Sequence, residues 1–135
     1  MSVTASPVLR IGPFSVSVDK DRVAAFGSDI SFSEERSKAE VPLTFPIIWL
    51  SHPEVTAALF DDPAFADRLP ILEMQDFSYE DTLKIGDVLC VDVERKVDQS
   101  HPTTIEIVAR VQKPSGPTVV TFAARYRLIH RMDAR

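Results

Sequence analysis

Apolar and polar residues alternate along three segments in the second half of the chain. A period of two is typical of strands that have one buried face and one face in water. We therefore predict strands at about 87–98, 103–112 and 118–131, with a less regular strand at 71–79 before them. The residues expected to face the core of the three alternating strands are Leu89, Val91, Val93, Val97, Ile105, Ile107, Ala109, Val111, Val120, Phe122, Ala124, Tyr126 and Leu128.

An apolar stretch upstream is the best candidate to cover the buried face of this sheet. Residues 41–50 are nearly all apolar, and Thr44 is placed to cap a helix that has Pro46 in its first turn. Pro53 either interrupts this helix or begins a second one that runs through Phe60. The pattern predicts an α+β protein in which a curved antiparallel sheet wraps around one central helix.

The N-terminal part is less regular. Residues 1–12 are expected to form a loose arm, followed by a short strand at 14–18. Asp19 is a good N-cap for a helix that Gly27 is expected to end. With 135 residues, the whole chain (1–135) is expected to form a single domain.

Composition and charge exclude several classes of function. The formal net charge of -5 and the scattered basic residues disfavour nucleic-acid binding. The sequence has no apolar run of about 18 residues that would cross a membrane, and its first residues do not resemble a signal peptide. One cysteine, Cys90, rules out an internal disulfide, so we expect a cytoplasmic protein. The histidines His52, His101 and His130 are far apart in the sequence, and we expect neither a metal site nor a cofactor.

Three local motifs, in order and with fitting gaps, resemble one family. Residues 41–46 (Val-Pro-Leu-Thr-Phe-Pro) precede the predicted central helix, residues 71–77 (Ile-Leu-Glu-Met-Gln-Asp-Phe) form a strand, and residues 85–87 (Ile-Gly-Asp) form a turn. Together they resemble the MaoC-like acyl dehydratases and hydratases, which have the hot-dog fold. The likeness is to the N-terminal branch of the fatty-acid-synthase type and covers nearly the whole chain.

The resemblance implies an acyl-thioester substrate and a pair of catalytic residues. Active members have an Asp followed five residues later by a His, on a segment before the central helix. Asp29 matches the Asp, but Glu34 stands at the position of the His. A carboxylate and an imidazole suit the addition of water to an enoyl thioester, because one takes a proton and the other donates one. The missing His favours either a non-catalytic partner of a catalytic hydratase subunit or an atypical hydro-lyase that uses Asp29 and Glu34.

The same resemblance suggests residues that bind the substrate. Backbone donors at the start of the central helix, near Thr44 and Phe45, would polarise the thioester carbonyl. An acyl tunnel would run beside Trp49, and Arg125 and Arg127 would meet the phosphates of coenzyme A or the acidic helix of an acyl carrier protein.

Each of these residues also has a purely structural interpretation. Asp29 and Glu34 fit a solvated, charged segment, Trp49 fits the core, and the two arginines fit a solvated strand face.

Two other functions remain open, namely a hot-dog acyl-CoA thioesterase that activates water with Glu34 or Glu54, and an acyl- or carrier-binding module without catalysis.

A sheet of this kind needs its free edge covered, because unpaired strand edges invite pairing. Hot-dog proteins solve this by edge-to-edge association. We therefore expect a homodimer, or a heteromer with a catalytic hot-dog subunit, acting on acyl-CoA or acyl-carrier-protein thioesters.

Overall fold

The computed structural model describes residues 8–29, 41–98, 100–101 and 103–130. Its five strands form one antiparallel sheet with the order β1-β3-β4-β5-β2. The strands are β1 (Val8–Ser17), β2 (Arg68–Tyr79), β3 (Val88–Val97), β4 (Thr104–Gln112) and β5 (Thr118–His130). Thus β1 and β2 are the two outer strands of the sheet.

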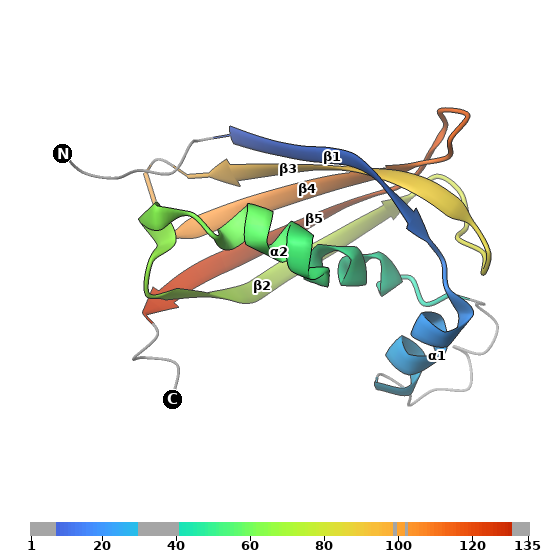
Figure 1. Ribbon diagram of the computed structural model, residues 1–135, viewed down its shortest axis with the longest axis horizontal. Coiled ribbons are helices and arrows are strands. Elements are labelled where there is room, and N and C mark those ends of the chain that lie inside the picture. The colour runs from blue at the N-terminus through green and yellow to red at the C-terminus, as the bar shows by residue number, and fades with distance from the viewer. Residues whose placement is uncertain (1–7, 30–40, 99, 102, 131–135) are drawn as a thin grey trace.

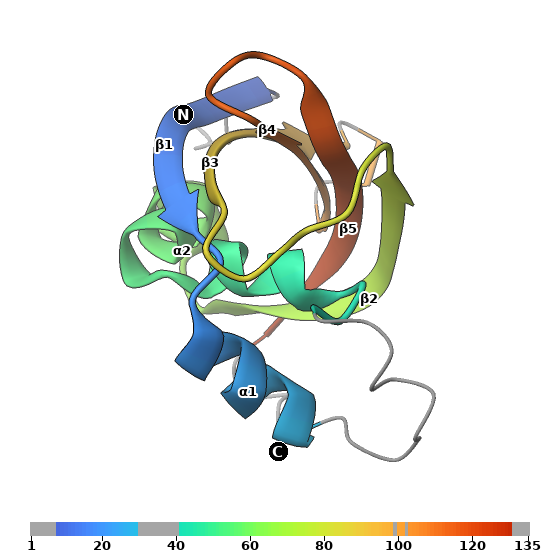
Figure 2. The ribbon, with the colours of Figure 1, turned by 90° about the vertical axis from the view of Figure 1, so that its right-hand side faces the viewer.

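The helical elements lie between β1 and β2 in the sequence. They are α1 (Lys20–Asp29), the 3-10 helix η2 (Phe45–Ser51), α2 (Pro53–Phe60) and the short 3-10 turn η3 (Pro63–Phe65). Figure 1 shows η2 and α2 as one continuous rod across the concave side of the sheet, and Figure 2 shows the sheet curling around this rod. The predicted curved antiparallel sheet around a central helical segment is therefore confirmed.

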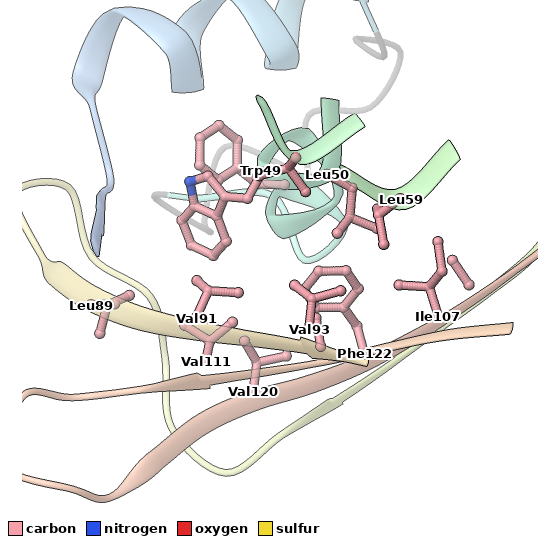
Figure 3. Close-up of a cluster of buried hydrophobic side chains, with 14 of the residues drawn as sticks. Trp49, Leu50, Leu59, Leu89, Val91, Val93, Ile107, Val111, Val120 and Phe122 are labelled. Atoms are coloured by element: carbon pink, nitrogen blue, oxygen red, sulfur yellow. The ribbon is translucent and has the colours of Figure 1, made fainter. Parts of the chain in front are cut away.

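The core lies between the rod and the inner face of the sheet (Figure 3). Phe45 and Leu59 of the rod are fully buried, and they pack with the apolar residues of β3, β4 and β5. The alternation predicted for these three strands matches their burial, since every second residue is buried from Leu89 to Val97 and from Ile105 to Val111. Burial of this many aliphatic and aromatic side chains is the main term that holds the rod in the sheet.

The rod differs in detail from the predicted helix. Its first half is a 3-10 helix, and Thr44 makes no side-chain capping hydrogen bond, because its backbone (φ -93°, ψ 0°) lacks the extended geometry of an N-cap. The second half does begin at Pro53, as one of the two predicted alternatives had it. There His52 is the cap, and its Nδ1 accepts a hydrogen bond from the backbone N–H of Glu54 at 3.3 Å.

The first strand is longer than predicted. It begins at Val8, so residues 8–11, assigned from the sequence to a loose arm, pair with β3 instead. A bulge between Ile11 and Phe14 interrupts the alternation of apolar and polar residues, so the sequence pattern does not indicate one continuous strand. Gly12 sits in this bulge at φ +104°, and a Cβ there would lie 2.6 Å from the carbonyl oxygen of Val91, so only glycine fits.

The helix α1 begins where predicted and ends later. Asp19 Oδ1 accepts hydrogen bonds from the backbone N–H groups of Asp21 (2.8 Å) and Arg22 (3.1 Å), which is the expected N-cap. The helix then continues through Gly27 to Asp29. A glycine inside a helix costs only about 1 kcal/mol, so it does not end a helix by itself. Within the described ranges, no helix is long and apolar enough to cross a membrane.

Candidate functional site

The main candidate site is a cavity between the edge strand β1 and the central rod. It has a volume of about 830 Å³ and is lined by β1 from Ile11 to Ser17, by Asp19 and Arg22 at the start of α1, and by Trp49, His52, Glu54 and Val55 of the rod. This size is within the range of small-molecule sites, about 300–1,000 Å³. We call it the β1 cavity.

Trp49 forms the deep wall of the β1 cavity. Its side chain is 3% exposed and packs edge-to-face on Phe45, with ring centroids 5.9 Å apart, and Phe45 packs in the same way on Phe26 at 5.6 Å. The expectation that Trp49 belongs to the core is therefore confirmed.

The indole nitrogen of Trp49 has unusual surroundings for a hydrogen-bond donor. It is buried, and no group in the described part of the chain accepts a hydrogen bond from it. Figure 3 shows this nitrogen on the side of the ring that faces the pale blue ribbon between β1 and α1. Buried donors are nearly always paired, and an unpaired one costs about 1–3 kcal/mol.

His52 contributes a second donor to the cavity lining. Because its Nδ1 accepts the N–H of Glu54, a neutral ring carries its proton on Nε2. In this tautomer the ring is a hydrogen-bond donor through Nε2 and has no free basic nitrogen. His52 therefore suits binding of an acceptor group better than proton abstraction.

The predicted carboxylate pair lies largely outside the described residues. Asp29 is the last residue of α1, but its side chain is not among those described, and Glu34 lies in the segment 30–40. The polar pattern of the sequence also predicts a short helix around residues 34–38, and this prediction too lies outside the described residues. The pairing of Asp29 with Glu34 therefore stays a prediction.

The start of the rod offers fewer backbone donors than expected. The N–H of Phe45 donates to the carbonyl of Pro42 at 3.0 Å, and the N–H of Ile47 donates to the carbonyl of Thr44 at 3.2 Å. Pro46, between them, has no N–H. These donors are engaged within the turn, so they are not available to polarise a thioester carbonyl, and the Phe45 side chain is fully buried.

Tyr79 of β2 holds the segment that leads into the rod. Its hydroxyl donates to the carbonyl of Leu43 at 2.6 Å. Burial raises the pKa of Tyr79 to about 12, because the phenolate would lose its hydration there.

Arg125 and Arg127 lie on the outer face of β5, as predicted, and share one carboxylate. Arg127 Nη2 is 2.9 Å from Glu73 Oε2, and Arg125 Nε is 3.9 Å from Glu73 Oε1. All three side chains are partly exposed, and Glu73 occupies the bulge between Leu72 and Met74 in β2. The two arginines lie on the opposite face of the sheet from the rod, so the structure does not bring them together with Trp49.

Arg95 is a buried charge that the sequence analysis did not single out. It points inward from β3 among Leu89, Val91, Val93 and Val97 and is only 1% exposed. Its Nη1 donates to the carbonyl of Leu59 at 2.7 Å.

Two further groups surround Arg95. Its Nη2 lies 3.7 Å from Asp62 Oδ2, and its guanidinium lies 5.1 Å from the centre of the Phe65 ring. Burial lowers the pKa of Arg95 and Asp62 opposes this shift, yet a guanidinium keeps its charge at any ordinary pH. In the sequence, the one sign of this buried charge is that an arginine stands at a position of β3 where the alternation predicts an apolar, inward-facing residue.

The outer strand β2 exposes three large apolar side chains next to the polar residues Glu73, Gln75 and Asp76. Ile71, Leu72 and Met74 are 43%, 42% and 44% exposed, and each residue from 71 to 76, taken with its backbone, is exposed in the single chain. Among the residues that the structure describes, no group of three His, Cys, Asp or Glu side chains is placed to hold a metal ion.

The architecture has clear counterparts among solved structures. One chain of the C-terminally truncated HadBC complex of Mycobacterium tuberculosis, a 3R-hydroxyacyl-ACP dehydratase, aligns with a TM-score of 0.68 at 16% identity, covering 92% of this chain and 99% of that chain. The (R)-hydratase of A. caviae aligns with a TM-score of 0.60 at 16% identity, covering 95% of this chain and 98% of its own. This chain has the hot-dog fold.

The same fold occurs in enzymes of other chemistry. The fluoroacetyl-CoA-specific thioesterase FlK, in complex with fluoroacetate and CoA, aligns with a TM-score of 0.63 at 11% identity over 100% of both chains. No protein-family model and no curated protein sequence matches this chain. At these identities the likeness establishes the hot-dog fold, and activity has to be argued from the site.

Proposed function

We propose that this chain binds acyl thioesters as a hot-dog subunit of the MaoC-like dehydratase branch and works as the non-catalytic partner of a catalytic hot-dog subunit. The fold supports this proposal, since a dehydratase complex and a hydratase share it over nearly their whole length. The replacement of the expected His by Glu34 argues against a complete catalytic pair in this chain.

The observation that carries the partner role is the edge of β2. Three large apolar side chains, Ile71, Leu72 and Met74, are more than 40% exposed on an outer strand. Such an edge is a liability unless another strand pairs with it. The proposed occupant is the equivalent edge of a second hot-dog chain.

Native mass measurement tests this assembly. In protein purified from its own cell we expect a mixed complex with a second small subunit, and in the isolated chain a dimer. Met74→Lys should shift the isolated chain to the monomer, because a charge on the pairing edge blocks strand addition. The matched control is Val88→Lys, which alters a 55% exposed valine of β3 away from the free edge. A monomer in both preparations would contradict the proposal.

Hydration of a trans-2-enoyl-CoA tests the non-catalytic assignment. We expect no loss of enoyl absorbance with the isolated chain. Brisk hydration would instead support the atypical hydro-lyase, in which case Asp29→Ala and Glu34→Ala should each lower the rate by orders of magnitude. Activity that is unchanged in both variants would show that these residues are not the catalytic pair.

A thioesterase is the second candidate, and the place of Glu54 favours it. This exposed carboxylate lines the β1 cavity together with Trp49 and His52, where it has access to water. A carboxylate of this kind can act as a general base toward water. Release of free thiol from a saturated acyl-CoA, lost in Glu54→Gln, would establish this alternative over the partner role.

A further inference from the structure

We propose that the β1 cavity is the site where this chain holds the acyl thioester, and that Trp49 Nε1 donates a hydrogen bond to the thioester carbonyl. This inference rests on the proposed function for the class of ligand. The position of the site, however, follows from the cavity and from the unsatisfied indole donor.

The donor points to a ligand with an acceptor group. The Trp49 nitrogen is buried, lies in the wall of an 830 Å³ cavity, and has no acceptor among the described residues. A bound carbonyl would supply the missing acceptor. Since the nitrogen atom itself has almost no contact with water, neighbouring side chains must shift slightly to admit the carbonyl, as rotamer changes at binding sites commonly do.

The charges around the cavity favour a neutral acceptor over a carboxylate. Asp19 and Glu54 each bring a negative charge, and among the lining residues that the structure describes, Arg22 is the one full positive charge. Asp19 is in addition fixed as the cap of α1. A free fatty acid would meet net repulsion from like charges, whereas an uncharged carbonyl would not.

The remaining walls fit an aliphatic chain. Ile11, Phe14 and Val16 of β1 are partly buried and pack against the core, and Val55 faces them from the rod. An aliphatic chain that ends in an uncharged carbonyl is the chemistry of an acyl thioester. The donor, the charges and the apolar walls therefore agree on one class of ligand.

Trp49 is the only tryptophan of the chain, so its fluorescence reports directly on this site. The probe is the octanoyl thioester of N-acetylcysteamine, and octanoate is the comparison ligand with a charged head. We expect the thioester to change the emission of Trp49 and to bind more tightly than octanoate. Calorimetry should give a dissociation constant about 2- to 10-fold weaker in Trp49→Phe, the value of one neutral hydrogen bond.

A second variant tests the same site even if Trp49→Phe does not fold. Val16→Phe narrows the cavity and should weaken thioester binding about fivefold or more, the cost of overpacking. Val88→Phe is the matched control, because this exposed residue of β3 does not line the cavity, and it should leave binding unchanged.

The outcomes separate the two proposals. Binding of the thioester without a change in Trp49 emission, and with unaltered affinity in Trp49→Phe and Val16→Phe, would overturn this site and leave the proposed function standing. Octanoate binding as tightly as the thioester would overturn the neutral-carbonyl assignment. Absence of any thioester binding by calorimetry would overturn the proposed function and this inference with it.

Discussion

The two ends of the central rod differ in what lies beside their buried polar side chains. At the α2 end, the carbonyl of Leu59 accepts a hydrogen bond from the buried guanidinium of Arg95, which also faces Asp62 and Phe65. At the η2 end, the buried nitrogen of Trp49 has no acceptor within the described residues and borders a large cavity. We call the α2 end the closed end, because the Arg95 side chain there binds the carbonyl of Leu59 and faces Asp62. We call the η2 end the open end, because the Trp49 donor there borders the β1 cavity.

The largest expected effect is at the closed end. Arg95→Ala should lower the free energy of unfolding by about 3 kcal/mol, the low end for breaking a buried ion pair, because the partly exposed Asp62 regains water. Arg95→Met keeps the volume and removes the buried charge, so it should cost only about 1–2 kcal/mol, for the lost donor to Leu59. Urea unfolding measures both. Equal and small losses would show that Arg95 does not hold the end of the rod.

An intermediate effect is expected where Tyr79 ties residue 43 to β2. Tyr79→Phe should lower the free energy of unfolding by about 1 kcal/mol, through loss of the hydrogen bond to Leu43.

Tyr79 also makes the free energy of unfolding depend on pH, and the direction follows from its raised pKa. An unfolded tyrosine ionises near pH 10, whereas Tyr79 in the fold has a pKa of about 12. The folded state therefore binds its proton more tightly. This contribution to stability is complete below pH 10 and is lost as the pH rises toward 12. Burial also raises the pKa of Tyr126, so Tyr79→Phe should weaken this alkaline loss without abolishing it. The measurement is urea unfolding of the wild type and of Tyr79→Phe at several pH values between 8 and about 11. Equal losses of stability in the two proteins would contradict the raised pKa of Tyr79.

The smallest effect on stability is expected at the open end. In Trp49→Phe the lost ring volume costs about 1 kcal/mol, whereas removal of a buried donor without an acceptor returns a similar amount. The variant should therefore unfold within about 1 kcal/mol of the wild type. A loss as large as that of Arg95→Ala would mean that the indole nitrogen has a protein partner and that the two ends do not differ in the way described.

Much of the fold was predictable because burial of a sheet leaves a period of two in the sequence. The inner residues of β3, β4 and β5 follow that period, and Asp19 and His52 are caps whose chemistry is local. The early start of β1 was missed because the bulge at Gly12 adds one residue to β1 and so reverses the alternation before it.

The site was less predictable, because its properties depend on contacts between distant segments. Nothing local marks Arg95 as the partner of a carbonyl 36 residues away, or shows that the nitrogen of Trp49 would lack an acceptor. The outer position of Arg125 and Arg127 followed from the alternation, but their shared partner Glu73 lies in the bulge of the neighbouring strand β2, more than 50 residues away in the sequence.

The most direct test of the open end is the ¹⁵N-¹H correlation spectrum of the protein, which should contain a single indole signal because the chain has one tryptophan. On addition of the octanoyl thioester of N-acetylcysteamine, we expect a downfield shift of this Trp49 N–H proton, together with shifts of the β1 amides that line the cavity. An indole signal that stays in place while amides elsewhere respond would place the ligand outside the β1 cavity and contradict the central claim.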